Sequence, residues 1–180
     1  MNIIDFEWIT KVLTFDTEIK PFESSNSDLN DFLLNDAKKY LYQRLAVTYI
    51  IENNTETIGY FCLSNDVVMR SLADNAGWKK IKKTIPNSKM RSSYPAVKIG
   101  RLAVSHKYEN NGFGRLILQT VKKKFVAENQ QTGCRFVTVD AKKDVVDFYT
   151  KNLFDFLTSE DENENTRLMY FDLNSLQQHT

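Results

Sequence analysis

The residues whose types and spacing could do chemistry lie between Arg101 and Arg115. An apolar run at residues 102–104 leads into a polar loop, two glycines follow at Gly112 and Gly114, and a helical pattern begins at once. A loop of this kind gathers backbone N–H groups at a helix N-terminus, where the helix dipole also favours negative charge. The glycines allow backbone angles and a close approach that side chains forbid. The segment therefore indicates an anion site, most naturally for phosphate; a strand-to-helix turn without a ligand is the alternative.

Several other kinds of site are excluded. A Walker A loop needs Gly-Lys-Ser or Gly-Lys-Thr, whereas Gly114 is followed by Arg115 and Leu116. The six-residue dinucleotide fingerprint is also absent, and no Gly-x-Ser-x-Gly elbow supports serine hydrolysis. His106 and His179 have no cysteine or carboxylate at metal-ligand spacing, so we expect no metal.

The composition fits one folded domain. The 180 residues are 42% hydrophobic and 26% charged, a balance that argues against intrinsic disorder. The net charge of +1 gives no general argument for nucleic-acid binding. No apolar run approaches the roughly 20 residues of a membrane-spanning helix. The first ten residues hold no basic leader and the chain has only two cysteines, so we expect a cytoplasmic location.

The elements that must position the loop follow from hydrophobic periodicity. Strands are expected at residues 12–21, 45–52, 57–63, 97–105, 136–139, 153–157 and 167–173. Helices are expected at residues 27–41, 113–129 and 144–151. Asn26 or Ser27 can cap the first helix, and the turn at residues 52–55 makes the second and third strands a hairpin. Lys122 to Lys124 should face solvent in part.

This order of elements predicts an α/β (α+β) fold with one central mixed sheet flanked by helices. We expect a single domain over residues 1–180, with a core at about residues 12–173 and a polar tail at residues 174–180. Residues 65–95 hold a basic run that contains no acid, and Pro86 breaks any helix there. Its members are Lys79, Lys80, Lys82, Lys83, Lys89 and Arg91. The run is either a solvated face or an RNA-binding surface.

The loop resembles that of the GNAT acetyltransferases, whose acyl-CoA motif reads Gln/Arg-x-x-Gly-x-Gly/Ala between a strand and a helix. Residues 109–114 fit this motif, except that Glu109 replaces Gln or Arg and brings an acid close to a pyrophosphate site. We expect the Glu109 side chain to point away, because backbone N–H groups do the binding. The resemblance spans roughly residues 15–173 and is strongest with the toxin-type branch. The matching segments are Gly59-Tyr60-Phe61, Tyr94-Pro95, Gly100-Arg101-Leu102-Ala103-Val104 and Asp147-Phe148-Tyr149.

The resemblance implies a GNAT fold in which the fourth and fifth strands splay apart around the pantetheine arm of acetyl-CoA. The implied cofactor-binding residues are Leu102, Ala103 and Val104 in the fourth strand, and Glu109, Asn110, Asn111, Gly112, Phe113, Gly114 and Arg115 in the loop. Tyr149 matches the tyrosine of a Phe-Tyr-x-x-x-Gly-Phe pattern, which donates a proton to the departing thiolate. A packed aromatic is the alternative for Tyr149. Leu153 stands where the pattern has glycine, which suggests a shifted turn.

The implied function is direct transfer of an acetyl group from acetyl-CoA to a primary amine, without a metal. An ordinary N-acetyltransferase for a small amine, peptide or protein ranks slightly first, because it asks for the fewest special features. One alternative is a toxin-type enzyme that acetylates aminoacyl-tRNA, with an antitoxin as partner and RNA held by Lys79, Lys80, Lys82 and Lys83. Another is a non-catalytic acyl-CoA-binding module. A homodimer is also considered, and no membrane partner is expected.

The general base is not assigned from the sequence. Glu52, Asp66 and Asp140 lie at strand ends that could face the cleft, but spacing singles out none of them. The family often uses an ordered water instead.

Overall fold

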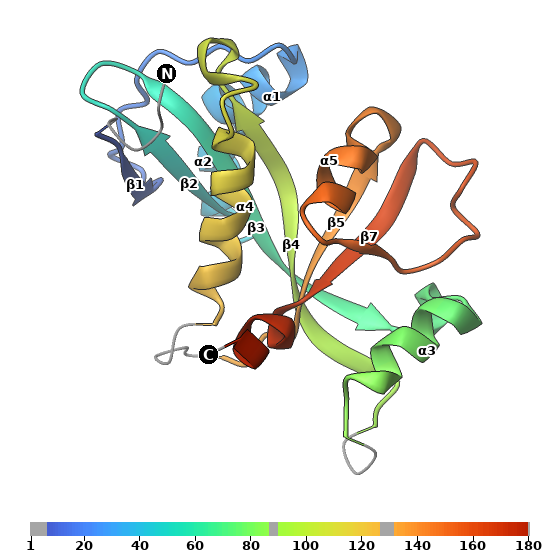
Figure 1. Cartoon of the computed structure of the whole chain (residues 1–180). Coiled ribbons are helices and arrows are strands. Elements are labelled where there is room, and N and C mark those ends of the chain that lie inside the picture. Colours follow the sequence, from blue (N-terminus) through green and yellow to red (C-terminus); the bar gives the residue numbers. More distant parts are fainter. Residues whose placement is uncertain (1–6, 87–89, 127–131, 180) are drawn as a thin grey trace. The chain divides into compact units, whose positions relative to one another are not determined.

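The computed structural model describes residues 7–86, 90–126 and 132–179 of the chain. Seven strands form a sheet in the order β1-β2-β3-β4-β5-β7-β6 (Figure 1). β4 and β5 are parallel and the pairs β1–β2, β2–β3, β5–β7 and β6–β7 are antiparallel, so the predicted mixed sheet is confirmed. The strands are β1 Ile9–Val12, β2 Val47–Glu52, β3 Thr57–Met69, β4 Ser93–Val104, β5 Phe136–Lys142, β6 Asp155–Phe156 and β7 Thr166–Asp172.

The α-helices are α1 Ser27–Asp31, α2 Ala37–Tyr42, α3 Asn75–Lys83, α4 Phe113–Lys124 and α5 Val146–Lys151. A π-helical turn, Phe32–Asp36, joins α1 to α2. The chain divides into two compact units. The first comprises Met1–Ser64 and Ile99–Val121, and the second comprises Asn65–Lys98 and Lys122–Thr180.

The first unit packs the helical segment α1–α2 against β2, β3 and β4. Asn26 caps α1 by accepting hydrogen bonds from the N–H groups of Asp28 and Leu29, as predicted. The Tyr60 hydroxyl donates to the Leu29 carbonyl at 2.7 Å, which fixes this helix on the sheet. The core residues are Leu13, Phe32, Leu33, Ala37, Ile50, Tyr60, Cys62 and Ala103.

The second unit packs α3 against β5 and β7. Asp74 caps α3, because its carboxylate accepts the Gly77 N–H at 2.7 Å. Trp78 and Ile81, three residues apart, form the buried face of the helix. They belong to a core with Val68, Ala73, Ile85, Tyr94, Ala96, Phe136, Leu157 and Tyr170.

Two expectations about the elements are wrong. The first strand is Ile9–Val12 rather than residues 12–21, because the chain turns where the Thr14 N–H bonds to the Thr17 hydroxyl at 2.8 Å. The basic run holds a helix, α3, which ends before Pro86 and so is not broken by it. A 3₁₀ helix, Leu173–His179, lies in the segment predicted as a polar tail, and the sequence made no prediction of its secondary structure.

Other expectations hold with changed bounds. The helix predicted at residues 27–41 is interrupted by the π-helical turn, and the helix after the loop ends at Lys124. Residues 127–129 of that prediction, and Lys89 of the basic run, lie outside the described residues. The parallel pairing of β4 with β5 covers Ala96–Lys98 and Phe136–Thr138, within the second unit. Within the described ranges, no helix has the length and apolar character needed to cross a bilayer.

Candidate functional site

The strand that leads into the loop is held by close backbone packing in the first unit. A Cβ atom on Gly59 would lie 2.7 Å from the Ala103 carbonyl oxygen, so only glycine lets β3 approach β4 this closely. The Ser105 N–H donates to the Ile58 carbonyl at 2.7 Å just after β4 ends. The Ala103 side chain is buried, whereas Leu102 and Val104 are half-buried. The end of β4 is therefore a fixed platform for the loop.

The loop itself needs two left-handed residues. Asn110 has φ 60° and Gly112 has φ 85°, and asparagine and glycine are the residues that adopt this region most readily. A 3₁₀ turn, His106–Tyr108, precedes them, and α4 begins at Phe113 directly after Gly112. The first-turn N–H groups of a helix have no intrahelical acceptor. The predicted geometry of strand, glycine loop and helix N-terminus is thus present.

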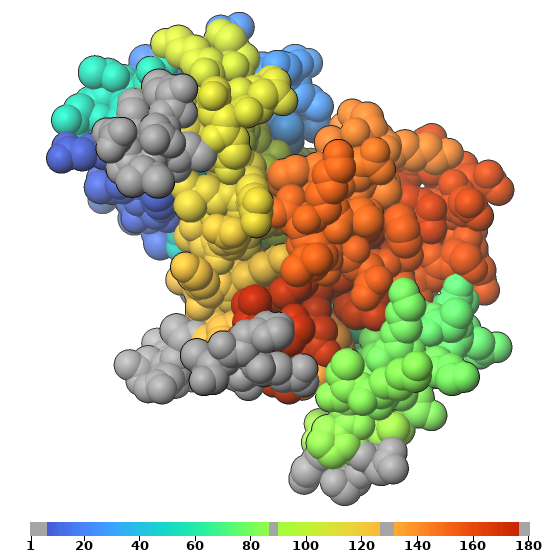
Figure 2. Space-filling view, in the orientation of Figure 1, coloured from blue at the N-terminus to red at the C-terminus, as the bar shows by residue number. Residues whose placement is uncertain are grey.

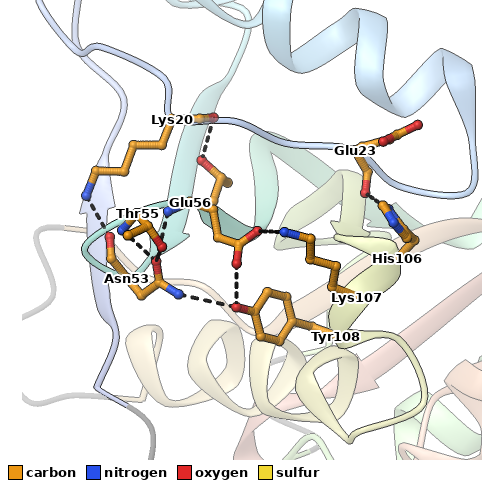
Figure 3. A network of polar contacts seen from close by, with 9 residues as sticks. Lys20, Glu23, Asn53, Thr55, Glu56, His106, Lys107 and Tyr108 are labelled. Atoms are coloured by element: carbon orange, nitrogen blue, oxygen red, sulfur yellow. Dashed lines mark hydrogen bonds and ion pairs between the residues drawn. The ribbon is translucent and has the colours of Figure 1, made fainter.

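A polar network joins this loop to the β2–β3 hairpin (Figure 3). Glu56 accepts hydrogen bonds from Lys107 Nζ at 2.7 Å and from the Tyr108 hydroxyl at 2.9 Å. Hydrogen bonding from Lys107 holds the pKa of Glu56 below its usual range. Asn53 Nδ2 also donates to the Tyr108 hydroxyl at 3.3 Å. The Tyr108 ring packs edge-on against Phe113 at 5.4 Å, so the network reaches the first residue of α4.

The chain before α1 supports the loop from another side. His106 places both its backbone N–H and its ring Nδ1 2.9 Å from the Glu23 carbonyl oxygen, so Nδ1 carries the hydrogen. Glu109 accepts hydrogen bonds from Ser25, at 3.3 Å from the N–H and 2.9 Å from the hydroxyl. The Glu109 carboxylate is therefore turned towards Ser25, which removes the conflict between this acid and an anion at the loop.

Tyr149 lies on α5 in the second unit. It is 6% exposed, and its ring packs edge-on against Phe148 at 5.1 Å and Phe154 at 5.3 Å. Its hydroxyl has no hydrogen-bond partner among the described residues. Burial raises the pKa of Tyr149 above its usual value near 10, and a phenol is protonated at neutral pH even without this shift. A protonated hydroxyl without an intramolecular partner has the state required of a proton donor.

The turn after α5 contains a strained residue. Leu153 adopts the left-handed conformation, with φ 66°, that glycine adopts most readily. The Phe154 N–H donates to the Tyr149 carbonyl at 3.0 Å, which closes the turn. These backbone bonds hold a leucine at a position that disfavours one, and the shift suggested from the sequence stays a prediction.

This strained position gives a stability prediction. Leu153→Gly should raise the free energy of unfolding by about 0.5–1 kcal/mol. The left-handed leucine costs about 1–2 kcal/mol, and the entropy of glycine offsets part of the gain. Leu153 is 74% exposed, so little packing is lost. Urea unfolding measures the change, with Leu153→Ala as the control that keeps the strain. A Leu153→Gly protein less stable than Leu153→Ala would contradict the prediction.

The three carboxylates considered as bases differ in their surroundings. Burial acts to raise the pKa of Glu52, but ion pairs with Lys11 at 2.9 Å and Lys20 at 3.0 Å outweigh it and lower the pKa. Glu52 is 3% exposed and is paired with both lysines. Asp140 pairs with Lys98 at 2.5 Å, and Asp66 accepts a hydrogen bond from the Thr138 hydroxyl. The geometry selects none of them as a base.

The basic run forms a surface on α3 that the sequence did not assign to a helix. Lys79, Lys82, Lys83 and Arg70 line a hollow of about 560 Å³ together with Asn75, Trp78 and Met90. No acidic residue lines it, and none of the three lysines has an ion-pair partner in the described chain. Lys80 differs, because it pairs with Asp155 at 3.2 Å. We call Arg70, Lys79, Lys82 and Lys83 the α3 basic surface; Figure 2 shows the α3 segment, in green, at the surface.

The described ranges contain no cluster of metal-ligating side chains. No group of three or more His, Cys, Asp or Glu side chains there could hold a metal ion.

Comparisons with known proteins identify the family. The acetyltransferase (GNAT) domain profile matches residues 82–174, more than half of the chain. The structure is similar to AtaT complexed with acetyl-methionyl-tRNAfMet, with a TM-score of 0.78, 21% identity, and coverage of 95% of this chain and 98% of that one. It is also similar to a tyrosine-to-phenylalanine variant of KacT, with a TM-score of 0.77, 21% identity, and coverage of 97% and 100%. The chain therefore belongs to the GNAT acetyltransferase family.

A third similar structure contains the cofactor. It is a tyrosine-to-phenylalanine variant of AtaT bound to the C-terminus of the antitoxin AtaR and acetyl-CoA, with a TM-score of 0.72, 19% identity, and coverage of 96% and 97%. At these identities the likeness shows the fold, and the family defines the chemistry. The chain is an acetyl-CoA-dependent acyltransferase, as the resemblance implied.

Proposed function

We propose that this enzyme transfers the acetyl group of acetyl-CoA to the amino group of aminoacyl-tRNA. The observation that carries the proposal is the α3 basic surface, whose lysines are not neutralised by any acid in the described chain. RNA phosphates are bound by clustered Lys and Arg side chains, and such contacts supply most of the affinity. A small amine or a short peptide would need no such surface. The similar AtaT is complexed with acetyl-methionyl-tRNAfMet, an acetylated aminoacyl-tRNA, which supports the same choice.

The proposal gives each part of the candidate site a role. The backbone of Leu102, Ala103 and Val104 binds the pantetheine arm. The loop residues bind the pyrophosphate through N–H groups at the start of α4. Glu109 and the network around Glu56 hold that loop in its binding conformation. The loop residues concerned are Glu109, Asn110, Asn111, Gly112, Phe113, Gly114 and Arg115.

Tyr149 supplies the proton in this proposal. The amine attacks the thioester carbonyl directly, a C–N bond forms, the C–S bond breaks, and the thiolate takes the phenolic proton. The attacking nitrogen releases one proton to water as the amide forms, and a proton from water restores the phenol. The similar structures of AtaT and KacT each carry a tyrosine-to-phenylalanine substitution, the same type of change that tests this step here.

An acceptor of this kind implies a partner and a compartment. Acetylation of the amino group blocks peptide-bond formation by that residue, so an organism that makes such an enzyme needs to restrain it. The similar AtaT variant is bound to the C-terminus of the antitoxin AtaR. Another similar structure is a KacTA–DNA complex. A neighbouring reading frame that encodes a DNA-binding antitoxin would fit the proposal. Aminoacyl-tRNA and acetyl-CoA meet in the cytoplasm.

A competition assay tests the acceptor class. The purified protein is incubated with radiolabelled acetyl-CoA and a mixture of aminoacyl-tRNAs, polyamines and peptides, and the fractions are then separated. We expect the label in the tRNA fraction. Label in the polyamines or peptides, with none in tRNA, would restore the ordinary N-acetyltransferase as the function.

The α3 basic surface gives a prediction of its own. Wild-type binding to tRNA should weaken with salt. Replacing Lys79, Lys82 and Lys83 together by Gln should flatten the slope of log K against log salt by roughly 0.7–0.9 for each phosphate that these lysines neutralise. Acetyl-CoA affinity should not change, and surface changes of this kind cost little stability, within about 0.5 kcal/mol each. Filter binding at several salt concentrations measures the slope.

Lys80→Gln is the matched control for this series. Lys80 lies on the same helix but pairs with Asp155, so its replacement should change the slope less than any one of the other three. If the slope of log K against log salt is the same for the wild type and the triple variant, the α3 basic surface does not bind RNA and is a solvated face.

A further inference from the structure

Lys122 has an environment that its place in a run of three lysines does not suggest. It is 8% exposed, not turned to solvent as the sequence led us to expect. Its Nζ atom lies 2.6 Å from the Asn152 carbonyl oxygen, 3.6 Å from the centre of the Phe171 ring and 5.0 Å from that of Phe154. It forms none of the ion pairs found in the described ranges. A carbonyl and two ring faces are therefore the groups that compensate its charge.

Such a residue is hard to explain by stability alone. Burial lowers the pKa of Lys122 to about 8, so folding disfavours the charged form. A buried charge is often replaced by an apolar side chain of similar volume without loss of stability. The presence of lysine at this position points instead to something that its charge holds in place.

Its main contact is the end of the helix that carries Tyr149. Asn152 is the C-cap of α5, and the Lys122 ammonium lies where the helix dipole favours a positive charge. The helix has only six residues, so contacts from outside must fix it. The Asn152 N–H and side-chain amide bond back to carbonyls of α5, the nearest being the side-chain contact with Phe148 at 2.8 Å.

The second contact leads to the tyrosine ring itself. Phe154 lies between Lys122 and Tyr149, with its ring 5.3 Å from the Tyr149 ring and 5.8 Å from the Phe171 ring. The left-handed Leu153 separates Asn152 from Phe154. Lys122 thus holds both ends of a turn that leucine does not favour, and this turn forms one wall around Tyr149.

We propose that Lys122 is a positioning residue for Tyr149: its ammonium holds the Asn152–Phe154 turn so that the phenol stays where it can protonate the thiolate. The proposal rests on the acid role given to Tyr149 above. Lys122 itself transfers no proton. Because small misplacements of a reacting group can cost orders of magnitude in rate, the effect should appear in kcat rather than in binding.

The test uses Lys122→Met, which keeps length and apolar volume but removes the charge, and Lys122→Arg, which keeps the charge. Each is made alone and together with Tyr149→Phe, and methionyl-tRNA is the acceptor. We expect Lys122→Met to keep the melting temperature, the Kd for acetyl-CoA and the KM for the acceptor, while kcat falls by about 10–100-fold. Lys122→Arg keeps the charge but not the shape of the ammonium, so it should keep a kcat clearly above that of Lys122→Met. In the Tyr149→Phe protein, Lys122→Met should have less than about a twofold further effect, because the two residues act as a unit.

An unchanged kcat in Lys122→Met, or an equal loss with and without the tyrosine hydroxyl, would overturn the proposal. If Lys122→Met does not fold, Phe154→Leu removes the intervening ring and must show the same dependence on Tyr149.

If Tyr149→Phe alone keeps the wild-type kcat, the assigned acid is wrong and the positioning role of Lys122 is wrong too. If kcat falls in Tyr149→Phe but not in Lys122→Met, Tyr149 keeps its role as the acid and Lys122 is not a positioning residue. If methionyl-tRNA takes no label, the acceptor is wrong, and the same cycle is run on the acceptor that does.

Discussion

Tyr149→Phe should lower kcat by about 10²–10⁴-fold while the affinity for acetyl-CoA stays within about threefold of wild type. The variant removes one oxygen from a ring that is 6% exposed and packed against Phe148 and Phe154, so the shape of the site is kept. The hydroxyl has no hydrogen-bond partner in the described chain, so its loss leaves no partner unsatisfied. Steady-state kinetics and calorimetry measure the two quantities.

Tyr170→Phe is the matched control for this variant. Tyr170 is also buried in the second unit and burial also raises its pKa, but it lies on β7 in the core around Trp78. Its replacement should leave kcat within about threefold. If Tyr149→Phe behaves like this control, Tyr149 is a packing residue and another group is the acid.

Gly112→Asp should weaken acetyl-CoA binding by about 100-fold. A carboxylate about 5 Å from one phosphate charge costs about 3 kcal/mol at an effective dielectric constant of 20. Gly112 has φ 85°, so a side chain there is also strained. Isothermal titration calorimetry measures the Kd, and circular dichroism checks that the fold is intact.

Gly112→Asn separates the two causes, because asparagine has nearly the same size and strain without the charge. The aspartate variant should bind more weakly than the asparagine variant, and added salt should narrow the difference. Wild-type affinity in a folded Gly112→Asp protein would show that the pyrophosphate does not bind at this loop.

The parts of the fold that the sequence predicted are those with a strong local signal. The hairpin followed from its β-branched strands and polar turn, the first helix from Asn26 and its apolar period, and the loop from two glycines before a helix. The capping residue Asp74 and the apolar pair Trp78 and Ile81 were also a local signal for α3. The lysines around this pair and the nearby Pro86 concealed it.

The rest depends on contacts between residues far apart in the chain. The first strand lies at Ile9–Val12 because it pairs with β2, some forty residues later, and no periodicity of its own marks it. Glu109 can be reconciled with an anion site only through Ser25. Lys122 resembles its two neighbours in sequence, and only its contacts with Asn152, Phe154 and Phe171 distinguish it. Such pairings are set by tertiary packing, which a single sequence does not reveal.

The most direct test of the central claim is the chemical identity of the product. The enzyme is incubated with acetyl-CoA and methionyl-tRNA, the ester is cleaved with mild base, and the released amino acid is analysed by mass spectrometry. Uncharged tRNA and free methionine serve as parallel acceptors. We predict N-acetylmethionine from the charged tRNA, at a kcat/KM far above that for free methionine, and no product from uncharged tRNA. Release of unmodified methionine from the charged tRNA, with a polyamine or peptide acetylated under the same conditions, would contradict the account.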